Sequence, residues 1–232
     1  MASTCECCAS GIRSTSSPFR RQYRVFKHLP SAIAPRAYLY TGEWMAIDYL
    51  PGETKAALPS SSELAALLYD LHRQSCFGWR IMLLPLLEGY WHAARGRRTP
   101  FWLRRLKRLR QQGEPTPLRW RRYIWMCMRA IWFMVRKGVR LIDWEYAGDG
   151  DIALELAAVW MDNDAQRRAL VDDYARRSAI APAQLWRQVR RWRPSQVLML
   201  MAGWYECRWQ QTGEQQFITL ANEVWRQLQT EG

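Results

Sequence analysis

The residues best suited to chemistry lie in one short stretch, LIDWEYAGDGD, at residues 141–151. The apolar run just before Asp143 predicts a short strand that delivers this carboxylate into an exposed turn. A carboxylate in such a turn can anchor a Mg²⁺ ion that bridges nucleotide phosphates. Asp143 is therefore our candidate metal ligand. The alternative is an ordinary turn or helix-capping residue.

The segment before this stretch has an unusual composition. Residues 119–138 read RWRRYIWMCMRAIWFMVRKG, and residues 119–140 contribute seven positive charges and no negative one. Removing these seven from the net charge of +13 leaves +6. The charge excess that would favour a nucleic-acid partner therefore depends on this segment. The seven are Arg119, Arg121, Arg122, Arg129, Arg136, Lys137 and Arg140.

Hydrophobic spacing predicts the elements that surround these residues. We expect a helix from residue 18 to Pro30, and two short strands between residues 37 and 52. Ser60 and Glu63 form a capping-box pattern at the start of another helix. In the C-terminal third, helices are predicted over residues 154–160, 165–175, 183–192, 197–209 and 214–228.

Residues 101–113, FWLRRLKRLRQQG, predict a basic amphipathic helix. A solvated basic face explains its charges better than nucleic-acid or membrane binding.

The longest apolar run, Tyr123 to Val135, is too short to span a bilayer, which takes about 20 residues. Because no signal-peptide pattern is present either, we expect a cytoplasmic protein. Cys5 and Cys8 form a C-x-x-C without a second ligand pair, so free thiols are expected rather than a zinc site.

Several stretches together resemble a known family. IDWEYAGDGDIALELAAVW resembles the aminoglycoside phosphotransferase and choline kinase superfamily, with Glu155 where that superfamily usually has Asp. WMAIDYLPG, at residues 44–52, is similar to its adenine-binding hinge. The chain as a whole is similar to the bacterial thiamine kinases through RRQYRVFKHLPSAIAPRAYLY, FGWRIMLLPLLEGYW, PAQLWRQVRRW and AGWYECRWQQTGEQQF.

The resemblance implies a protein-kinase-like α+β fold with a truncated β-rich N-lobe and a mainly helical C-lobe. It divides the chain into an aberrant or disordered N-terminus (1–17), an N-lobe remnant with the hinge (18–52) and the C-lobe (53–232). Asp48, Tyr49 and Leu50 would form the hinge that holds ATP. Asp143 would bind Mg²⁺, and thiamine, whose ring is cationic, would be the substrate, with Trp144 and Glu145 as candidate neighbours. For these two residues the sequence favours structural roles, core packing for the indole and capping for the carboxylate. We expect a monomer that binds neither nucleic acid nor a membrane.

The catalytic loop departs from this family. The family pattern His-x-Asp-x-x-x-x-Asn falls on Ile124, Met126 and Ile131, none of which can accept a proton or bind Mg²⁺. The codons CAT-ATG-GAT-GTG-CAT-GCG-GGC-AAT-CTG-GTT encode His-Met-Asp-Val-His-Ala-Gly-Asn-Leu-Val. Read one nucleotide later, they encode Ile-Trp-Met-Cys-Met-Arg-Ala-Ile-Trp, which is residues 124–132 here. We hypothesise that roughly residues 119–138 are a frameshifted translation, with a compensating shift before LIDWE.

The same shift of reading frame, applied to the N-terminus, gives a less close match to the family. Regrouped codons for Cys7 to Ser17 can yield a strand and turn of the kind expected before PFRRQYR.

The function that the resemblance implies is ATP-dependent phosphorylation of thiamine in thiamine salvage. Because this chain lacks the catalytic Asp, it should be inactive or nearly so. The alternatives are a related phosphotransferase acting on an aminoglycoside or choline-like alcohol, and a catalytically dead pseudokinase or basic nucleic-acid-binding protein.

Overall fold

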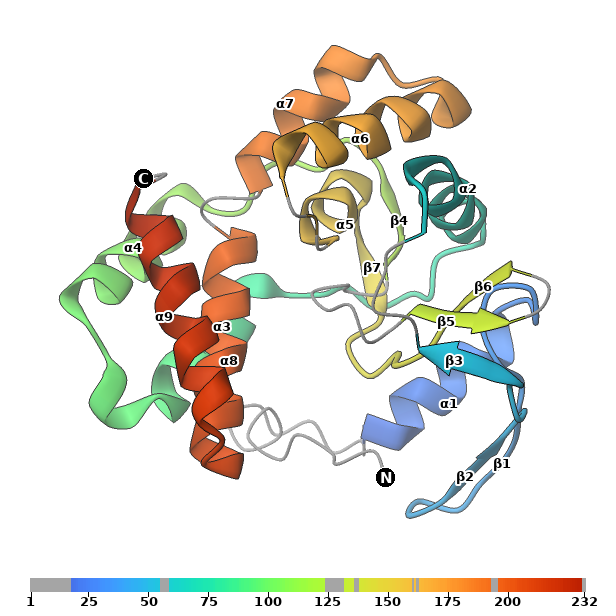
Figure 1. The fold of residues 1–232 in the computed structure, drawn as a ribbon, viewed down its shortest axis with the longest axis horizontal. Helices are drawn as coiled ribbons and strands as arrows, with labels where there is room; N and C mark the ends of the chain where they lie inside the picture. The colour runs from blue at the N-terminus through green and yellow to red at the C-terminus, as the bar shows by residue number, and fades with distance from the viewer. Residues whose placement is uncertain are drawn as a thin grey trace. The chain divides into compact units, whose positions relative to one another are not determined.

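The structure, a computed structural model, describes residues 18–54, 59–123, 132–135, 138–159, 161, 163–192 and 196–230. Ile124, Met126, Ile131 and residues 1–17, for which the sequence made specific predictions, lie outside the described residues. The chain forms two compact units. Among the described residues, one unit contains residues 82–116 and those from 190 to 230, and the other contains residues 18–81 and 117–189. Figure 1 labels the elements of both units.

The second of these units begins with α1 (Pro18–His28), which buries Val25 and Phe26. Strands β1 (Ala37–Tyr40) and β2 (Met45–Ile47) form an antiparallel hairpin in which Tyr40 faces Met45. Gly42 has a φ of 94° in the connecting turn, a conformation that favours glycine. The predicted helix and hairpin are both present.

Two further sheets complete this unit. Strand β5 (Trp132–Val135) lies between β3 (Gly52–Thr54) and β6 (Gly138–Leu141), and β4 (Trp120–Tyr123) pairs antiparallel with β7 (Gly148–Asp151). The sequence did not predict β7, which reads GDGD and has no apolar side chain. At Gly148 an added Cβ would lie 2.7 Å from the Cγ1 atom of Ile81. This close approach requires glycine.

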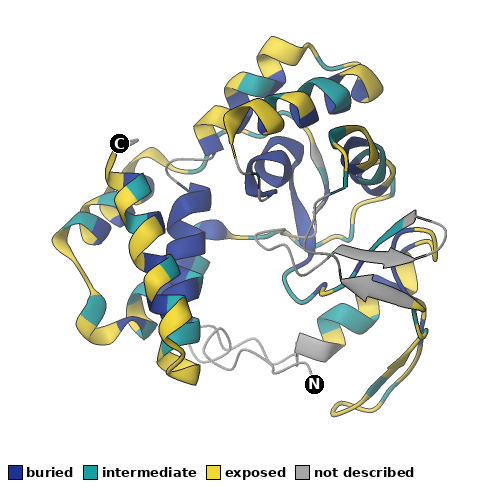
Figure 2. Ribbon diagram, viewed as in Figure 1, coloured by how far each residue is buried: buried dark blue, intermediate teal, exposed yellow. Residues whose placement is uncertain are grey.

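The helices of the same unit are α2 (Ser61–His72), α5 (Ile152–Ala158), α6 (Asp164–Ser178) and the start of α7 (Pro182–Trp192). The capping box before α2 is confirmed, because Ser60 Oγ accepts from Glu63 N–H and Glu63 Oε2 accepts from Ser60 N–H. Every residue of α5 is buried, as the dark blue ribbon in Figure 2 shows. Helix α5 is therefore a core element of this unit.

The other unit contains α3 (Leu83–Ala93), the 3₁₀ helix η2 (Arg95–Arg97), α4 (Pro100–Gln112), α8 (Leu198–Thr212) and α9 (Gln215–Thr230). Trp102 is fully buried and contacts Trp91 and Trp225, with ring centroids 5.3 and 4.7 Å away. Gly213, whose φ is 70°, caps the C-terminus of α8. The helices predicted over residues 197–209 and 214–228 are present in this unit.

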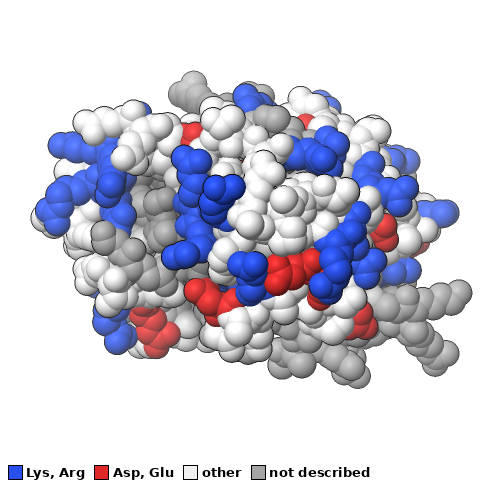
Figure 3. All heavy atoms as spheres, turned by 90° about the horizontal axis from the view of Figure 1, so that it is seen from above, with Lys and Arg blue, Asp and Glu red and all other residues white. Residues whose placement is uncertain are grey.

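Helix α4 has the amphipathic form that its sequence predicts. Trp102, Leu106 and Leu109 are buried, while Arg104 and Lys107 are exposed. On the face drawn in Figure 3, Lys and Arg side chains form several groups, with Asp and Glu between some of them. Among the described residues, no helix is both long and apolar enough to cross a membrane.

Candidate active site

Asp143 stands two residues after the end of β6, where the backbone turns sharply. Its φ of 65° is in the left-handed region, which non-glycine residues rarely adopt and which costs about 1 kcal/mol or more. The residue is exposed. The structure therefore places the predicted carboxylate at the surface of a strained turn.

Neighbouring contacts hold the backbone of this turn. Leu141 N–H, at the end of β6, donates to the carbonyl oxygen of Ile33 at 2.8 Å. Trp144 is fully buried, and its indole Nε1–H donates to Leu141 O at 2.9 Å. Trp144 thus has the packing role that we favoured. Its burial resists any relaxation of the strained residue beside it.

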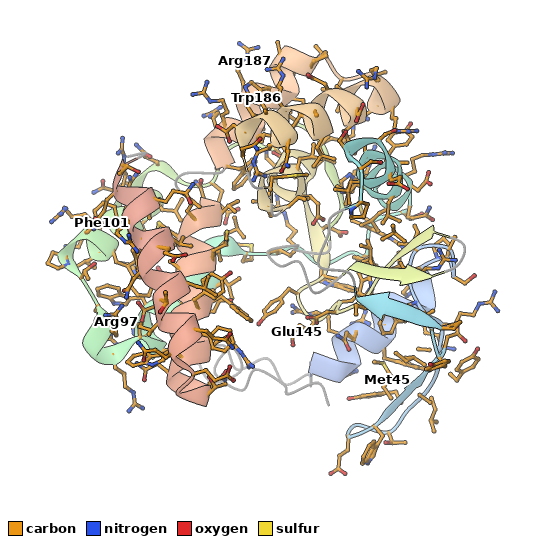
Figure 4. The ribbon with its side chains drawn as sticks, in the orientation of Figure 1. Met45, Arg97, Phe101, Glu145, Trp186 and Arg187 are labelled. Carbon is orange, nitrogen blue, oxygen red and sulfur yellow. The ribbon has the colours of Figure 1, made fainter. Side chains whose placement is uncertain are left out.

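The environment of the Asp143 carboxyl affects its charge. The protein around the carboxyl reduces its solvation and raises its pKa, although the residue remains accessible. A hydrogen bond from the backbone N–H of Glu145 partly offsets this increase in pKa. Gln22 on α1 also reaches the carboxylate, with Nε2 3.5 Å from Oδ1. Glu145 itself is half-buried and follows directly on the turn (Figure 4).

The two other carboxylates of the GDGD segment have structural roles. Asp149 accepts hydrogen bonds from the backbone N–H groups of Phe77 and Gly78, both at 2.7 Å. Asp151 caps α5 by accepting from Ala153 N–H, and it also accepts from the side chain of Gln188 at 3.0 Å. These bonds occupy both carboxylates. Unlike these two carboxylates, Asp143 is exposed.

A stack of side chains that the sequence did not predict holds the loop after α2. Arg122 is buried, and its guanidinium carbon lies 4.4 Å from the ring centroid of Phe77. It donates to the carbonyl oxygens of Ser75 and His28. Phe77 in turn stacks on Trp79 with 5.0 Å between ring centroids. Burial lowers the pKa of Arg122, and the nearby charge of Asp149 opposes this effect.

The predicted hinge lies directly after β2. Asp48 forms hydrogen bonds through both its backbone and its side chain. Its N–H donates to Arg36 O at 2.9 Å, and its carboxylate accepts from Arg36 N–H and Tyr38 Oη. The bond from Tyr38, then that from Arg36, lowers the pKa of Asp48. Tyr49 is largely exposed. The side chain of Asp48 is thus engaged within the hinge itself, and contact with adenine stays a prediction for the backbone of Asp48, Tyr49 and Leu50.

The oxygen ligands that the chain offers decide which kind of Mg²⁺ site it can form. Magnesium in phosphotransferases is usually held by one or two carboxylates together with waters and substrate phosphates. In the described part of the chain there is no group of three His, Cys, Asp or Glu residues that could enclose a metal ion. An accessible single carboxylate at Asp143 fits a nucleotide-bound Mg²⁺ and does not fit a closed protein site.

Comparison with solved structures defines the class of fold. The chain is similar to a choline/ethanolamine kinase family protein from Mesorhizobium loti, with a TM-score of 0.73, 14% identity and coverage of 93% of this chain and 79% of the other. It is also similar to choline kinase LicA from Streptococcus pneumoniae, with a TM-score of 0.68, 11% identity and coverage of 96% and 83%. At this identity the likeness shows the fold alone, which is the predicted kinase-like α+β fold.

Sequence comparison defines the family. No family model matches the chain. A curated thiamine kinase from Escherichia coli O17:K52:H18 (strain UMN026 / ExPEC) is 60% identical over 211 residues, which are 90% of this chain and 77% of that protein. One from Shigella dysenteriae serotype 1 (strain Sd197) is 60% identical over 213 residues, or 91% and 77%. The chain belongs to the thiamine kinase family.

Proposed function

We propose that this chain carries the scaffold of an ATP-dependent thiamine kinase, which transfers a phosphate to the hydroxyl group of thiamine. The observation that supports the proposal most strongly is the 60% identity to curated thiamine kinases over nine-tenths of the chain. Its accessible Asp143, held in a strained turn, suits the metal-binding carboxylate that phosphoryl transfer requires.

The remaining roles follow from this proposal. Residues 18–52 would be the remnant of the N-lobe with the hinge, and the backbone of Asp48, Tyr49 and Leu50 would hold the adenine of ATP. Asp143 would hold Mg²⁺, which neutralises charge on the phosphates when bound. The cationic ring of thiamine would be attracted by acidic or aromatic side chains. Glu145 is the accessible acidic candidate nearest in sequence to Asp143. A monomeric cytoplasmic enzyme without nucleic-acid or membrane partners remains our expectation.

The chain as written should nevertheless turn over little or no thiamine. Its sequence has Met126 and Ile131 where the family has the loop Asp and Asn. Neither side chain can accept the proton of the substrate hydroxyl or bind Mg²⁺. Since positioning and electrostatics provide nearly all catalysis in phosphoryl transfer, their loss should abolish it. We attribute the departure to a frameshift across roughly residues 119–138.

The test compares two purified proteins in a thiamine phosphorylation assay with ATP and Mg²⁺. The first is the chain as written, and the second has residues 1–17 and 119–138 replaced by their translation in the alternative frame. We expect thiamine phosphate from the second protein only. Asp143→Asn in the second protein is the matched control and should remove activity. Comparable turnover by the chain as written would contradict the role of the loop.

The substrate itself is tested with a panel of alcohols. The restored protein is supplied in turn with thiamine, choline and an aminoglycoside, and ADP release is measured. A preference for thiamine supports the proposal, whereas a preference for another alcohol would favour the related phosphotransferase. Sequencing the gene across codons 1–20 and 117–140 tests the frameshift directly. The hypothesis fails if no frame encodes His-Met-Asp-Val-His-Ala-Gly-Asn.

A further inference from the structure

Helix α1 contacts the candidate metal ligand through one side chain. The Nε2 atom of Gln22 lies 3.5 Å from Oδ1 of Asp143, and the two residues are 121 positions apart in the sequence. An ionised carboxylate only accepts hydrogen bonds, so the amide nitrogen of Gln22 is the atom that faces it. The distance is at the long end of the hydrogen-bond range.

The same part of the chain also holds the backbone of the Asp143 turn. Pro30 O accepts from Ile33 N–H at 2.9 Å, which forms a turn directly after α1. Ile33 O then accepts from Leu141 N–H at 2.8 Å, two residues before Asp143. Residues 18–34 therefore contact both the carboxylate and the strand that leads to it.

The uncharged nature of Gln22 matters for binding a cation. The other polar side chains of α1 are basic or aromatic, namely Arg20, Arg21, Tyr23, Arg24, Lys27 and His28. A lysine or arginine at position 22 would pair with Asp143 and compete with a metal ion for it. A neutral amide orients the carboxylate and leaves its negative charge available.

We infer that Gln22 is a positioning residue that holds the Asp143 carboxylate in the orientation in which it binds a divalent cation. This inference rests on the proposed metal role of Asp143. Donors that orient a metal-binding carboxylate commonly change metal affinity about 10- to 100-fold when removed. Because the contact is long, a smaller effect of about three- to tenfold is expected.

The experiment measures Mn²⁺ binding to the full chain in the presence of ADP, from the electron paramagnetic resonance signal of free Mn²⁺. The variants are Gln22→Met, which removes the donor at similar length, Gln22→Lys, which adds a competing charge, and Asp143→Asn. Arg20→Met on the same helix is the matched control because Arg20 is exposed. Thermal unfolding of each variant checks that the fold is retained.

The expected order of affinity is native and Arg20→Met, then Gln22→Met about three- to tenfold weaker, then Gln22→Lys weaker still, with no binding by Asp143→Asn. If Asp143→Asn abolishes binding but both Gln22 variants bind as the native chain does, the positioning role is wrong and the metal role of Asp143 stands. If Asp143→Asn binds Mn²⁺ as the native chain does, or the native chain binds none, the metal role fails and the positioning role fails with it.

Discussion

Asp149 accepts a hydrogen bond from the backbone N–H of Gly78 at 2.7 Å, across 71 positions of sequence. A second bond of the same length comes from Phe77 N–H. A carboxylate that receives two backbone donors fixes the loop after α2 against β7. Asp143 and Asp149, two of the three aspartates in the stretch that first suggested chemistry, therefore have separate roles.

The first prediction separates these tasks. Asp149→Asn replaces one acceptor with an NH₂ group that opposes a backbone N–H, so the free energy of unfolding should fall by about 1–3 kcal/mol. Nucleotide-dependent Mn²⁺ binding should change little. Asp143→Asn should do the reverse and abolish Mn²⁺ binding with little effect on stability, because Asp143 is exposed. Urea unfolding measures the stability of both variants, and Mn²⁺ titration measures their metal affinity. Equal losses of stability and of Mn²⁺ affinity in the two variants would contradict a structural role for Asp149 and a metal role for Asp143.

The second prediction uses two helical glycines with opposite surroundings. A Cβ at Gly203 on α8 would lie 2.8–3.0 Å from Tyr90 on α3, whereas one at Gly89 on α3 would meet nothing within 4 Å. Gly203→Ala should destabilise the protein by about 1–3 kcal/mol through overpacking. Gly89→Ala should stabilise it by about 0.5–1 kcal/mol, because alanine favours helices. Chemical denaturation measures both, and a stabilising Gly203→Ala would rule out tight α3–α8 packing.

The third prediction concerns a buried ion pair. Glu206 is fully buried and accepts two bonds of 3.2 Å from Arg97, which also donates to Asn222. Arg97→Met leaves the buried carboxylate without its cation and should cost about 1–3 kcal/mol. This loss in the free energy of unfolding is smaller than the loss expected for a fully buried pair, because the Arg97 side chain is 35% exposed.

The matched control for this pair is Arg110→Met. Arg110 bonds Glu88 at 2.7 Å, but its side chain is 57% exposed. Removing it should cost no more than about 1 kcal/mol. Unfolding midpoints in urea measure both variants. Equal losses would show that burial of Glu206 does not decide the strength of the first pair.

The fourth prediction concerns the pH dependence of stability. His72 is buried, and its Nδ1 atom lies 2.7 Å from Tyr174 Oη. Burial, and secondarily the charge of Arg121, lowers the pKa of His72 from 6.5 to about 3. The unfolded chain therefore takes up the proton first as the pH falls. The stability that neutral His72 contributes is complete above pH 6.5 and is lost as the pH falls toward 3.

Between pH 7 and pH 5 this effect should reduce the free energy of unfolding by about 2 kcal/mol. His72→Gln cannot titrate and can still bond Tyr174, so its stability should fall by correspondingly less over the same interval. Urea unfolding of both proteins at pH 7, 6 and 5 measures the difference, in which the carboxylates shared by both proteins cancel. Parallel curves would show that His72 does not titrate on unfolding.

Local sequence patterns were sufficient for most of the helices and for the first hairpin. The capping box at Ser60 and Glu63, and the stripe of Leu185, Val189 and Trp192 on α7, involve residues within a few positions of one another. Side chains and backbone at such spacing interact whatever the rest of the chain does. Family membership was also readable, because many separate segments retain the family pattern. The same reasoning placed Asp143 in an exposed turn after a strand.

Only the tertiary structure decided which polar groups are already occupied. Strand β7 has no hydrophobic pattern and exists because β4 pairs with it. The donors to Asp149 lie about seventy positions away, and Gln22 lies 121 positions from Asp143. Burial of Arg122 against Phe77 likewise depends on α1 and the loop after α2. Contacts across such distances depend on how the chain folds back on itself, so no local pattern in the sequence encodes them.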